Sequence, residues 1–149
     1  MPDPVALLKK DHREVSAMLK TLEASKPGAR RRQLVDKLDA ALSLHMKIEE
    51  SDVYPLVSRL VDEEDAQEAG IEHGLARDGV AKLHELVDEP GFGAAVAMLT
   101  AGIKHHVKEE EQEMFPALKK KLDREELMAL GDTVANAKKG RATASATRA

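Results

Sequence analysis

The chain contains no cysteine and no tryptophan, and its aromatic residues are limited to one tyrosine and two phenylalanines. Without cysteine it cannot form disulfides, offer thiolate ligands to a metal or carry out thiol redox chemistry. Any redox metal would therefore be held by nitrogen and oxygen atoms. Because large rings are so few, the core must be built mainly from Leu, Ala and Val, and this favours helices packed on helices.

Long apolar runs are also missing, since no stretch approaches the length of a membrane span. The N-terminal residues lack the basic-then-apolar layout of a signal peptide, so we expect a cytoplasmic protein that does not act at a membrane. The content of 42% apolar and 34% charged residues is typical of a soluble globular domain, and the net charge of −4 argues against nucleic acid as a partner. We predict one domain, residues 1–138, followed by a disordered basic tail, residues 139–149.

Apolar residues recur at helical spacing in four long segments that are separated by short Pro-Gly breaks. The pattern predicts an all-α protein, an up-down-up-down four-helix bundle, with a short C-terminal helix packed on its outside or across one end. Asp3 before Pro4, Asp62 and Asp123 are the predicted helix starts. Pro55 and Pro116 lie late in the second and fourth helices and should kink or end them. The expected helices cover residues 4–24, the stripes 34–49, 62–87 and 96–110, and the C-terminal segment 123–138.

The two halves of the bundle match at a constant offset of 61 residues without a gap. Both polar and apolar core positions follow this offset, so a helical hairpin has been duplicated and the bundle should have approximate two-fold symmetry. The matched pairs include Asp11/Glu72, His12/His73, Leu38/Leu99, Leu42/Ile103, His45/His106, Glu49/Glu110, Glu50/Glu111, Tyr54/Phe115 and Pro55/Pro116.

The repeat keeps polar side chains on the apolar face of the helices. His45 and Glu49 are one turn apart on that face, and His106 and Glu110 repeat the arrangement. A buried carboxylate is costly unless it is paired or bound to metal, and no Lys or Arg lies on these stripes. The set suits two cations bridged by glutamates, with iron ranked first, then an iron–manganese pair, then zinc.

These residues resemble the hemerythrin-like HHE cation-binding domains in the stretches DHREV, HMKIEESDVYPLV, EHGLARD and HVKEEEQEMFPAL, over residues from about 4 to 120. The resemblance implies that two iron ions, joined by an oxo or hydroxo group, are held by six side chains of the motif. Glu49 and Glu110 would bridge the two ions. The implied metal ligands are His12, His45, Glu49, His73, His106 and Glu110.

One departure bears on function. Oxygen-carrying hemerythrins have a second His one turn after the third-helix His, where this chain has Arg77. The resemblance therefore points away from O2 carriage and toward reaction with a small oxidant, and we predict a catalase-like enzyme that decomposes hydrogen peroxide. The alternatives are a protein that binds or senses iron, O2 or nitric oxide without turnover, and a zinc-stabilised structural bundle. We expect a monomer or weak oligomer.

Further residues near the motif are candidates for supporting roles. Glu50 and Glu111 could accept protons at the rim of the site. Ideal helix geometry places Tyr54 away from the Glu49 face, which favours an aromatic packing role matching Phe115. A bulge caused by Pro55 would instead swing the Tyr54 hydroxyl toward the metals as a ligand, hydrogen-bond donor or radical site. Two other histidines, His84 and His105, are predicted to lie outside the site.

Overall fold

The computed structural model describes residues 2–148, with side chains up to residue 140. All regular elements in this part of the chain are helical, which confirms the predicted all-α class. Their bounds are α1 (Pro4–Glu23), α2 (Ala29–Ile48), η1 (Glu49–Val53), α3 (Tyr54–Leu60), α4 (Glu63–Glu85), α5 (Phe92–Glu109), η2 (Glu110–Met114), α6 (Phe115–Lys121) and α7 (Arg124–Arg148).

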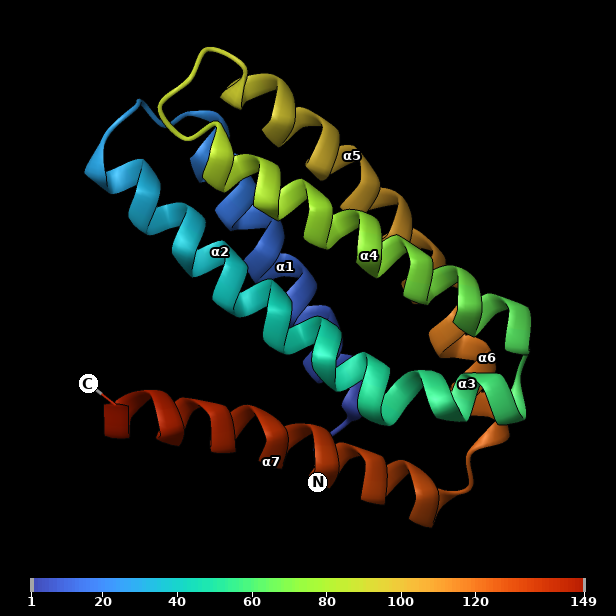
Figure 1. The fold of residues 1–149 in the computed structure, drawn as a ribbon. Coiled ribbons are helices and arrows are strands. Elements are labelled where there is room, and N and C mark those ends of the chain that lie inside the picture. The colour runs from blue at the N-terminus through green and yellow to red at the C-terminus, as the bar shows by residue number, and fades with distance from the viewer. Residues whose placement is uncertain (1, 149) are drawn as a thin grey trace.

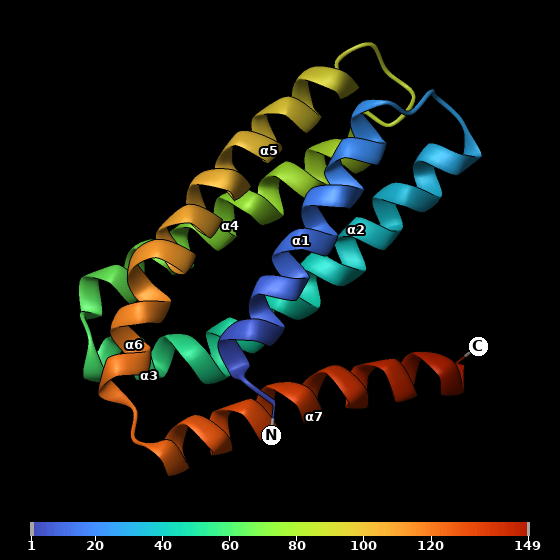
Figure 2. The same cartoon turned by 180° about the vertical axis from the view of Figure 1, so that it is seen from behind.

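Four helical rods form the bundle (Figure 1). Helix α1 packs against α2 and α5, and α4 packs against α2 and α5, so each rod has two neighbours and the centre is shared by all four. Seen from behind, α1 and α5 run side by side (Figure 2). The predicted up-down-up-down hairpin pair is confirmed.

The second and fourth rods do not end at their prolines. Each widens into one turn of π-helix, η1 or η2, and then continues as α3 or α6. The N–H of Tyr54 donates to the carbonyl of Glu49, five residues back, because Pro55 has no N–H with which to continue the normal pattern. The same step occurs between Phe115 and Glu110. Each π-turn begins at a buried glutamate.

The predicted helix starts are confirmed. The Asp3 side chain accepts a hydrogen bond from the Val5 N–H at 2.9 Å, and Asp62 accepts from the N–H of Glu64 at 2.8 Å. Asp123 accepts from the N–H of Glu126 at 2.8 Å, while the Glu126 carboxylate accepts from the Asp123 N–H. These caps satisfy backbone donors that the first turn of a helix leaves unpaired.

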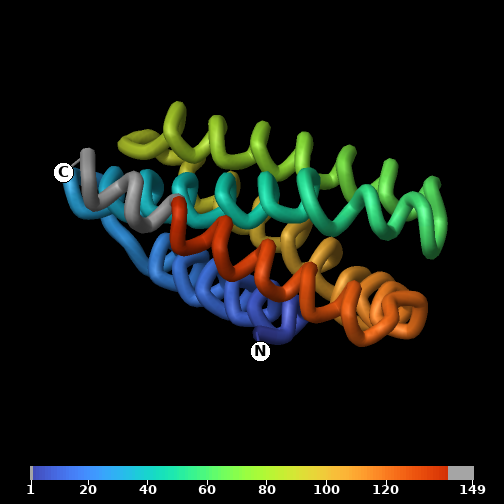
Figure 3. Tube along the Cα trace, turned by 90° about the horizontal axis from the view of Figure 1, so that it is seen from below, coloured from blue at the N-terminus to red at the C-terminus, as the bar shows by residue number. Residues whose placement is uncertain are grey.

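Helix α7 lies along α1 and α2 on the outside of the bundle rather than across its end (Figure 3). Gly131 makes this close approach possible, because a side chain there would collide with the carbonyl of Pro2. The bounds of α7 reach beyond residue 138, where the sequence predicted the helix to end, so this helix is longer than expected. The predicted tail, residues 139–149, lies from residue 141 outside the residues whose side chains are described, and it stays a prediction.

Two apolar clusters fill the bundle on either side of the polar centre. One gathers near the π-turns and α7, and the other near the loops that join the hairpin helices. At the loop end, Arg31 is buried against Phe92, with its guanidinium carbon 4.1 Å from the ring centroid, and it donates to backbone carbonyls of both loops. No helix within the described residues is long and apolar enough to span a membrane.

Candidate metal centre

Six side chains, five of them buried and His106 partly buried, converge between the two apolar clusters. They form two pockets that share both glutamates, and within each pocket the potential ligand atoms all lie within 4.8 Å of one another. We call them the first pocket (His12, His45, Glu49, Glu110) and the second pocket (Glu49, His73, His106, Glu110). The six residues that the sequence predicted to meet are therefore brought together.

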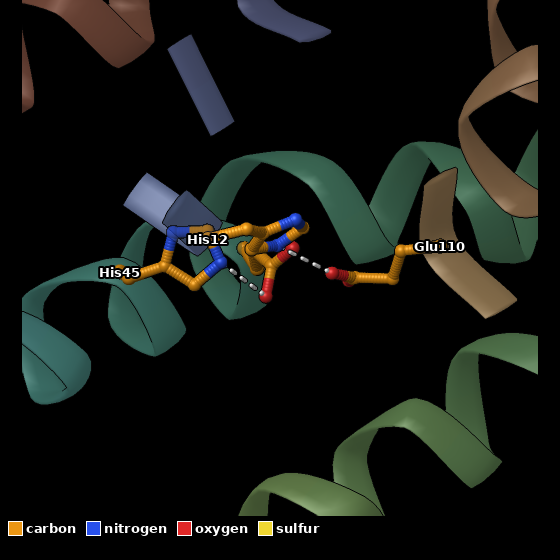
Figure 4. A group of neighbouring side chains, drawn as sticks. His12, His45 and Glu110 are labelled. Atoms are coloured by element: carbon orange, nitrogen blue, oxygen red, sulfur yellow. Dashed lines mark ion pairs between the residues drawn. The ribbon is translucent and has the colours of Figure 1, made fainter. Parts of the chain in front are cut away.

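The first pocket has polar atoms without partners. Among the described residues, no hydrogen bond reaches Nε2 of His12, Nε2 of His45, Oε2 of Glu49 or Oε1 of Glu110. His12 Nε2 lies 3.1 Å from Glu110 Oε1, and His45 Nε2 lies 3.2 Å from Glu49 Oε1, yet neither pair has hydrogen-bond geometry. Figure 4 shows His12, His45 and Glu110 directed toward one another. Buried polar atoms that point at a common space and have no hydrogen-bond partner are suited to holding a cation.

Every histidine of the centre is oriented by a carboxylate behind it. Nδ1 of His12 donates to Glu111 at 2.6 Å and Nδ1 of His45 donates to Asp11 at 2.9 Å. The repeat reproduces both contacts in the second half: Glu50 accepts from His73 at 2.6 Å and Glu72 accepts from His106 at 2.7 Å. A proton held on Nδ1 leaves the lone pair of Nε2 facing the pocket, which is the arrangement of metal-binding histidines.

The electrostatics of the centre favour positive charge. Burial lowers the pKa of His45, but Glu49 and Asp11 outweigh burial and raise that pKa to about 10. Burial also lowers the pKa of His106, but Glu110 and Glu49 outweigh burial and raise that pKa to about 11. Burial would raise the pKa of Glu49, yet the imidazole of His45 holds it well below its usual range. The two buried glutamates therefore attract cations, whether protons or metal ions.

Tyr54 places its hydroxyl in the second pocket. The oxygen lies 2.6 Å from Glu110 Oε2, to which it donates, 3.0 Å from His73 Nε2, and 3.1 Å from both His106 Nε2 and Glu49 Oε1. Burial raises the pKa of Tyr54, and the two glutamates raise it further above its ordinary value, so the phenol is neutral. The packing interpretation favoured by the sequence was incomplete, because the ring does join the apolar core while the hydroxyl touches four groups of the centre.

The π-turn η1 explains this position. One extra residue between Glu49 and Tyr54 rotates everything that follows by about a third of a helical turn, which swings residue 54 toward the Glu49 face. Phe115, the repeat partner of Tyr54, is moved in the same way by η2 and stacks on His12 with centroids 6.1 Å apart and ring planes 9° apart. The backbone is symmetric here, whereas only one side carries a hydroxyl.

Glu50, Glu111 and Arg77 lie outside the ring of potential ligands. The carboxylates of Glu50 and Glu111 are partly exposed, and each holds a histidine, as described above. Arg77 donates to Glu50 at 2.9 Å and is itself half exposed, so it supports His73 indirectly. Burial raises the pKa of Glu50, but Arg77 and His73 outweigh it and hold the pKa below its ordinary value.

The structure places two acids and one lysine beside the centre whose roles the sequence pattern does not predict. In the sequence, Asp11 and Glu72 stand out only as repeat partners, although each directly precedes a motif histidine. The Lys138 ammonium of α7 donates to Asp11, which in turn holds His45. Burial raises the pKa of Asp11, but His45 and Lys138 outweigh burial and lower it.

The two remaining histidines lie away from the pockets, as predicted. His84 is partly exposed and contacts Asp39 at 2.9 Å. His105 is 63% exposed and pairs with Glu109 at 3.0 Å on the surface. The pair of His105 and Glu109, which has the same four-residue spacing as His106 and Glu110, therefore lies outside the six-residue centre.

Comparison with known proteins agrees with this geometry. The family model of the hemerythrin HHE cation-binding domain matches residues 3–118, which end before α7. A crystal structure of a hemerythrin HHE cation-binding domain-containing protein from Mycobacterium kansasii superposes with a TM-score of 0.82 at 25% identity, covering 97% of this chain and 90% of that one. No curated protein sequence matches the chain.

Proposed function

Because the chain belongs to the hemerythrin HHE cation-binding domain family, we propose that it holds two iron ions in the two pockets and decomposes hydrogen peroxide there. The observation that carries the proposal is the set of four unpartnered buried atoms in the first pocket, opposite a second pocket of the same composition. Imidazole and carboxylate donors suit iron, and no thiolate is available to select a softer metal.

In this proposal the four histidines would bind through Nε2, and Glu49 and Glu110 would bridge the pockets because each belongs to both. Tyr54 would add a phenol oxygen to the second pocket, so the first pocket would keep more room for a small oxidant. When bound, the iron pair would supply the two-electron change that cleaves the O–O bond of peroxide. Two peroxides would thus become one O2 and two waters.

The chain's own groups have defined tasks. The carboxylates behind the histidines fix ring orientation and hold a proton on Nδ1, so that Nε2 faces the pocket where the metal would bind. The hydroxyl of Tyr54, 2.6 Å from Glu110, can exchange a proton inside the centre, and the partly exposed Glu50 and Glu111 can exchange protons with solvent at its rim. We propose that the protein works in the cytoplasm on its small oxidant, as a monomer or weak oligomer.

The replacement of a histidine by Arg77 supports turnover rather than O2 carriage. In the structure the Arg77 side chain pairs with Glu50 and brings no nitrogen to the pockets. A protein that binds or senses iron, O2 or nitric oxide without turnover would use the same pockets, and this is the second candidate. The two candidates differ in one measurable property, which is the release of O2 from peroxide.

The test is to purify the full-length protein, count bound metals, record the visible spectrum, add hydrogen peroxide and follow evolved O2. Two irons with O2 release are expected. The variant His106→Ala should lose stoichiometric iron and O2 release, whereas His105→Ala, its exposed neighbour, should behave like the wild type. Two irons without turnover would support the binding protein, and zinc in both pockets would contradict both candidates.

A further inference from the structure

A cavity of about 520 Å³ opens between the α1–α2 and α4–α5 hairpins, directly beside the metal centre. Its inner wall is formed by edges of all four histidines of the two pockets, and most of the remaining wall is apolar. Cavities of this size and character typically hold drug-sized organic molecules. Peroxide or O2 alone would need only a small part of this space.

The two halves of the repeat differ at the wall of this cavity. Several second-half positions that line it carry smaller side chains than their first-half partners, 61 residues earlier. In the repeat, Ala76 matches Val15, Ala95 matches Leu34, and Gly102 matches Ala41. An added Cβ at Gly102 would meet nothing within 4 Å, so this wall has unused room.

The mouth of the cavity is unusually apolar for a protein surface. Leu75 and Met98 line it and are 65% and 77% exposed. The repeat places Glu14 and Lys37 at the corresponding positions of the first half, which are the charged residues expected there. Exposed apolar side chains gathered at the opening of an apolar cavity indicate a binding site.

We propose that this cavity binds an uncharged, chain-like apolar molecule of the fatty-alcohol class, with one end beside the metal centre. The charged groups of the wall argue against a carboxylate head, because Glu72 and Asp78 are acidic. The one lysine of the wall, Lys82, already pairs with Glu85 at 3.1 Å. The assignment depends on the shape and lining of the cavity, and it holds whichever metal the pockets take.

Binding would have a direct effect on the centre. A chain in the cavity would cover the histidine edges on that side and exclude water from the pockets. An oxidant would then have to reach the metals by another route or share the cavity with the chain. The ligand would thereby control access to the pockets.

The test is calorimetric titration of the full-length protein with 1-octanol and, separately, with sodium octanoate. Octanol should bind at one site per chain, at least tenfold more tightly than octanoate. The double variant Ala76→Val/Ala95→Leu, which restores the first-half side chains, should bind octanol at least tenfold more weakly and keep its metal content. The variant Met98→Lys, which restores the charge of the first-half residue Lys37 at the mouth of the cavity, changes only an exposed position and should also weaken octanol binding.

The matched control is Ile71→Lys, which restores the first-half residue Lys10 at a position that is 66% exposed but outside the cavity wall. It should bind octanol as the wild type does. Octanol that does not saturate, or that binds the double variant and Met98→Lys as tightly as the wild type, would overturn the proposal. Tighter binding of octanoate than of octanol would overturn the assigned class.

Discussion

The first and second pockets each contain two histidines of their own and the same two glutamates, and the repeat relates them. Their chemistry nevertheless differs. In the second pocket the Tyr54 hydroxyl contacts all four ligand groups. In the first pocket the matching position is Phe115, whose ring stacks on His12 and offers no polar atom. Duplication preserved the backbone, including both π-turns, while one oxygen atom made the two sides unequal.

The difference shows which residues of a duplicated site can change without affecting both pockets. The ligand positions are constrained because each glutamate serves both pockets, so a change in either affects both. Residues 54 and 115 each face one pocket only. The pair can therefore diverge without loss of the shared core, and the following variants test that separation.

The largest effect is expected where the pockets are joined. Glu49→Gln keeps the shape of the side chain but removes a charge that both pockets share, so both should lose metal affinity by about 100-fold or more. His12→Ala removes a ligand from the first pocket alone and should leave about one metal per chain. Metal counting after dialysis distinguishes them. Equal loss in the two variants would show that the pockets do not bind independently.

The next effect concerns the hydroxyl itself. Iron in the second pocket would displace the proton of the neutral Tyr54 phenol, so in the iron-loaded protein Tyr54→Phe should abolish a visible phenolate-to-iron absorption band. The variant should also weaken the second pocket by about tenfold, because one oxygen donor is lost. Phe115→Tyr is the reciprocal change and should introduce such a band at the first pocket. A spectrum that is unchanged in Tyr54→Phe would remove Tyr54 from the ligand set.

A smaller effect is expected from the carboxylates behind the histidines. Asp11→Asn should weaken metal binding in the first pocket by about 10- to 100-fold, and Glu72→Gln should do the same in the second, because each orients one imidazole. Competition with a chelator of known affinity measures the metal affinity of both pockets. Weakening of both pockets by either single variant would contradict the assignment of one carboxylate to one side.

The smallest effect should come from α7. Lys138→Met removes the ammonium that contacts Asp11, and the affinity of the first pocket should fall by less than about fivefold, since a partly exposed ion pair contributes about 0.2–1 kcal/mol. The exposed neighbour provides the control, Lys139→Met, which should leave chelator competition unchanged. An effect of Lys138→Met on the second pocket would indicate a general loss of stability instead.

The fold and the six converging residues could be predicted because they depend on local spacing. Helical periodicity, aspartate caps and the 61-residue offset are all visible along the chain, and the structure confirms the bundle they imply. His45 and Glu49 lie together because they are one helical turn apart, and the repeat places His106 and Glu110 together in the same way.

Other features depend on more than local spacing. The position of Tyr54 depends on whether Pro55 kinks, ends or widens the helix, and these outcomes share the same sequence signal. The contact of Lys138 with Asp11 depends on how α7 docks, which the pattern of one helix does not specify. The cavity is lined by small side chains on both helices of the second hairpin, and no single stripe of residues reveals it.

The two shared glutamates also bear on how the chain is held closed. His12 reaches residues of the fourth rod, and 99 positions separate it from its hydrogen-bond partner Glu111. A chain without cysteine has no covalent link across such a distance. Metal ions held jointly by His12 and Glu110 would close a loop of similar length, and clips that close long loops remove the most entropy from the unfolded chain. The metal-loaded protein should therefore unfold as if a reversible cross-link joined the first and fourth rods of its bundle.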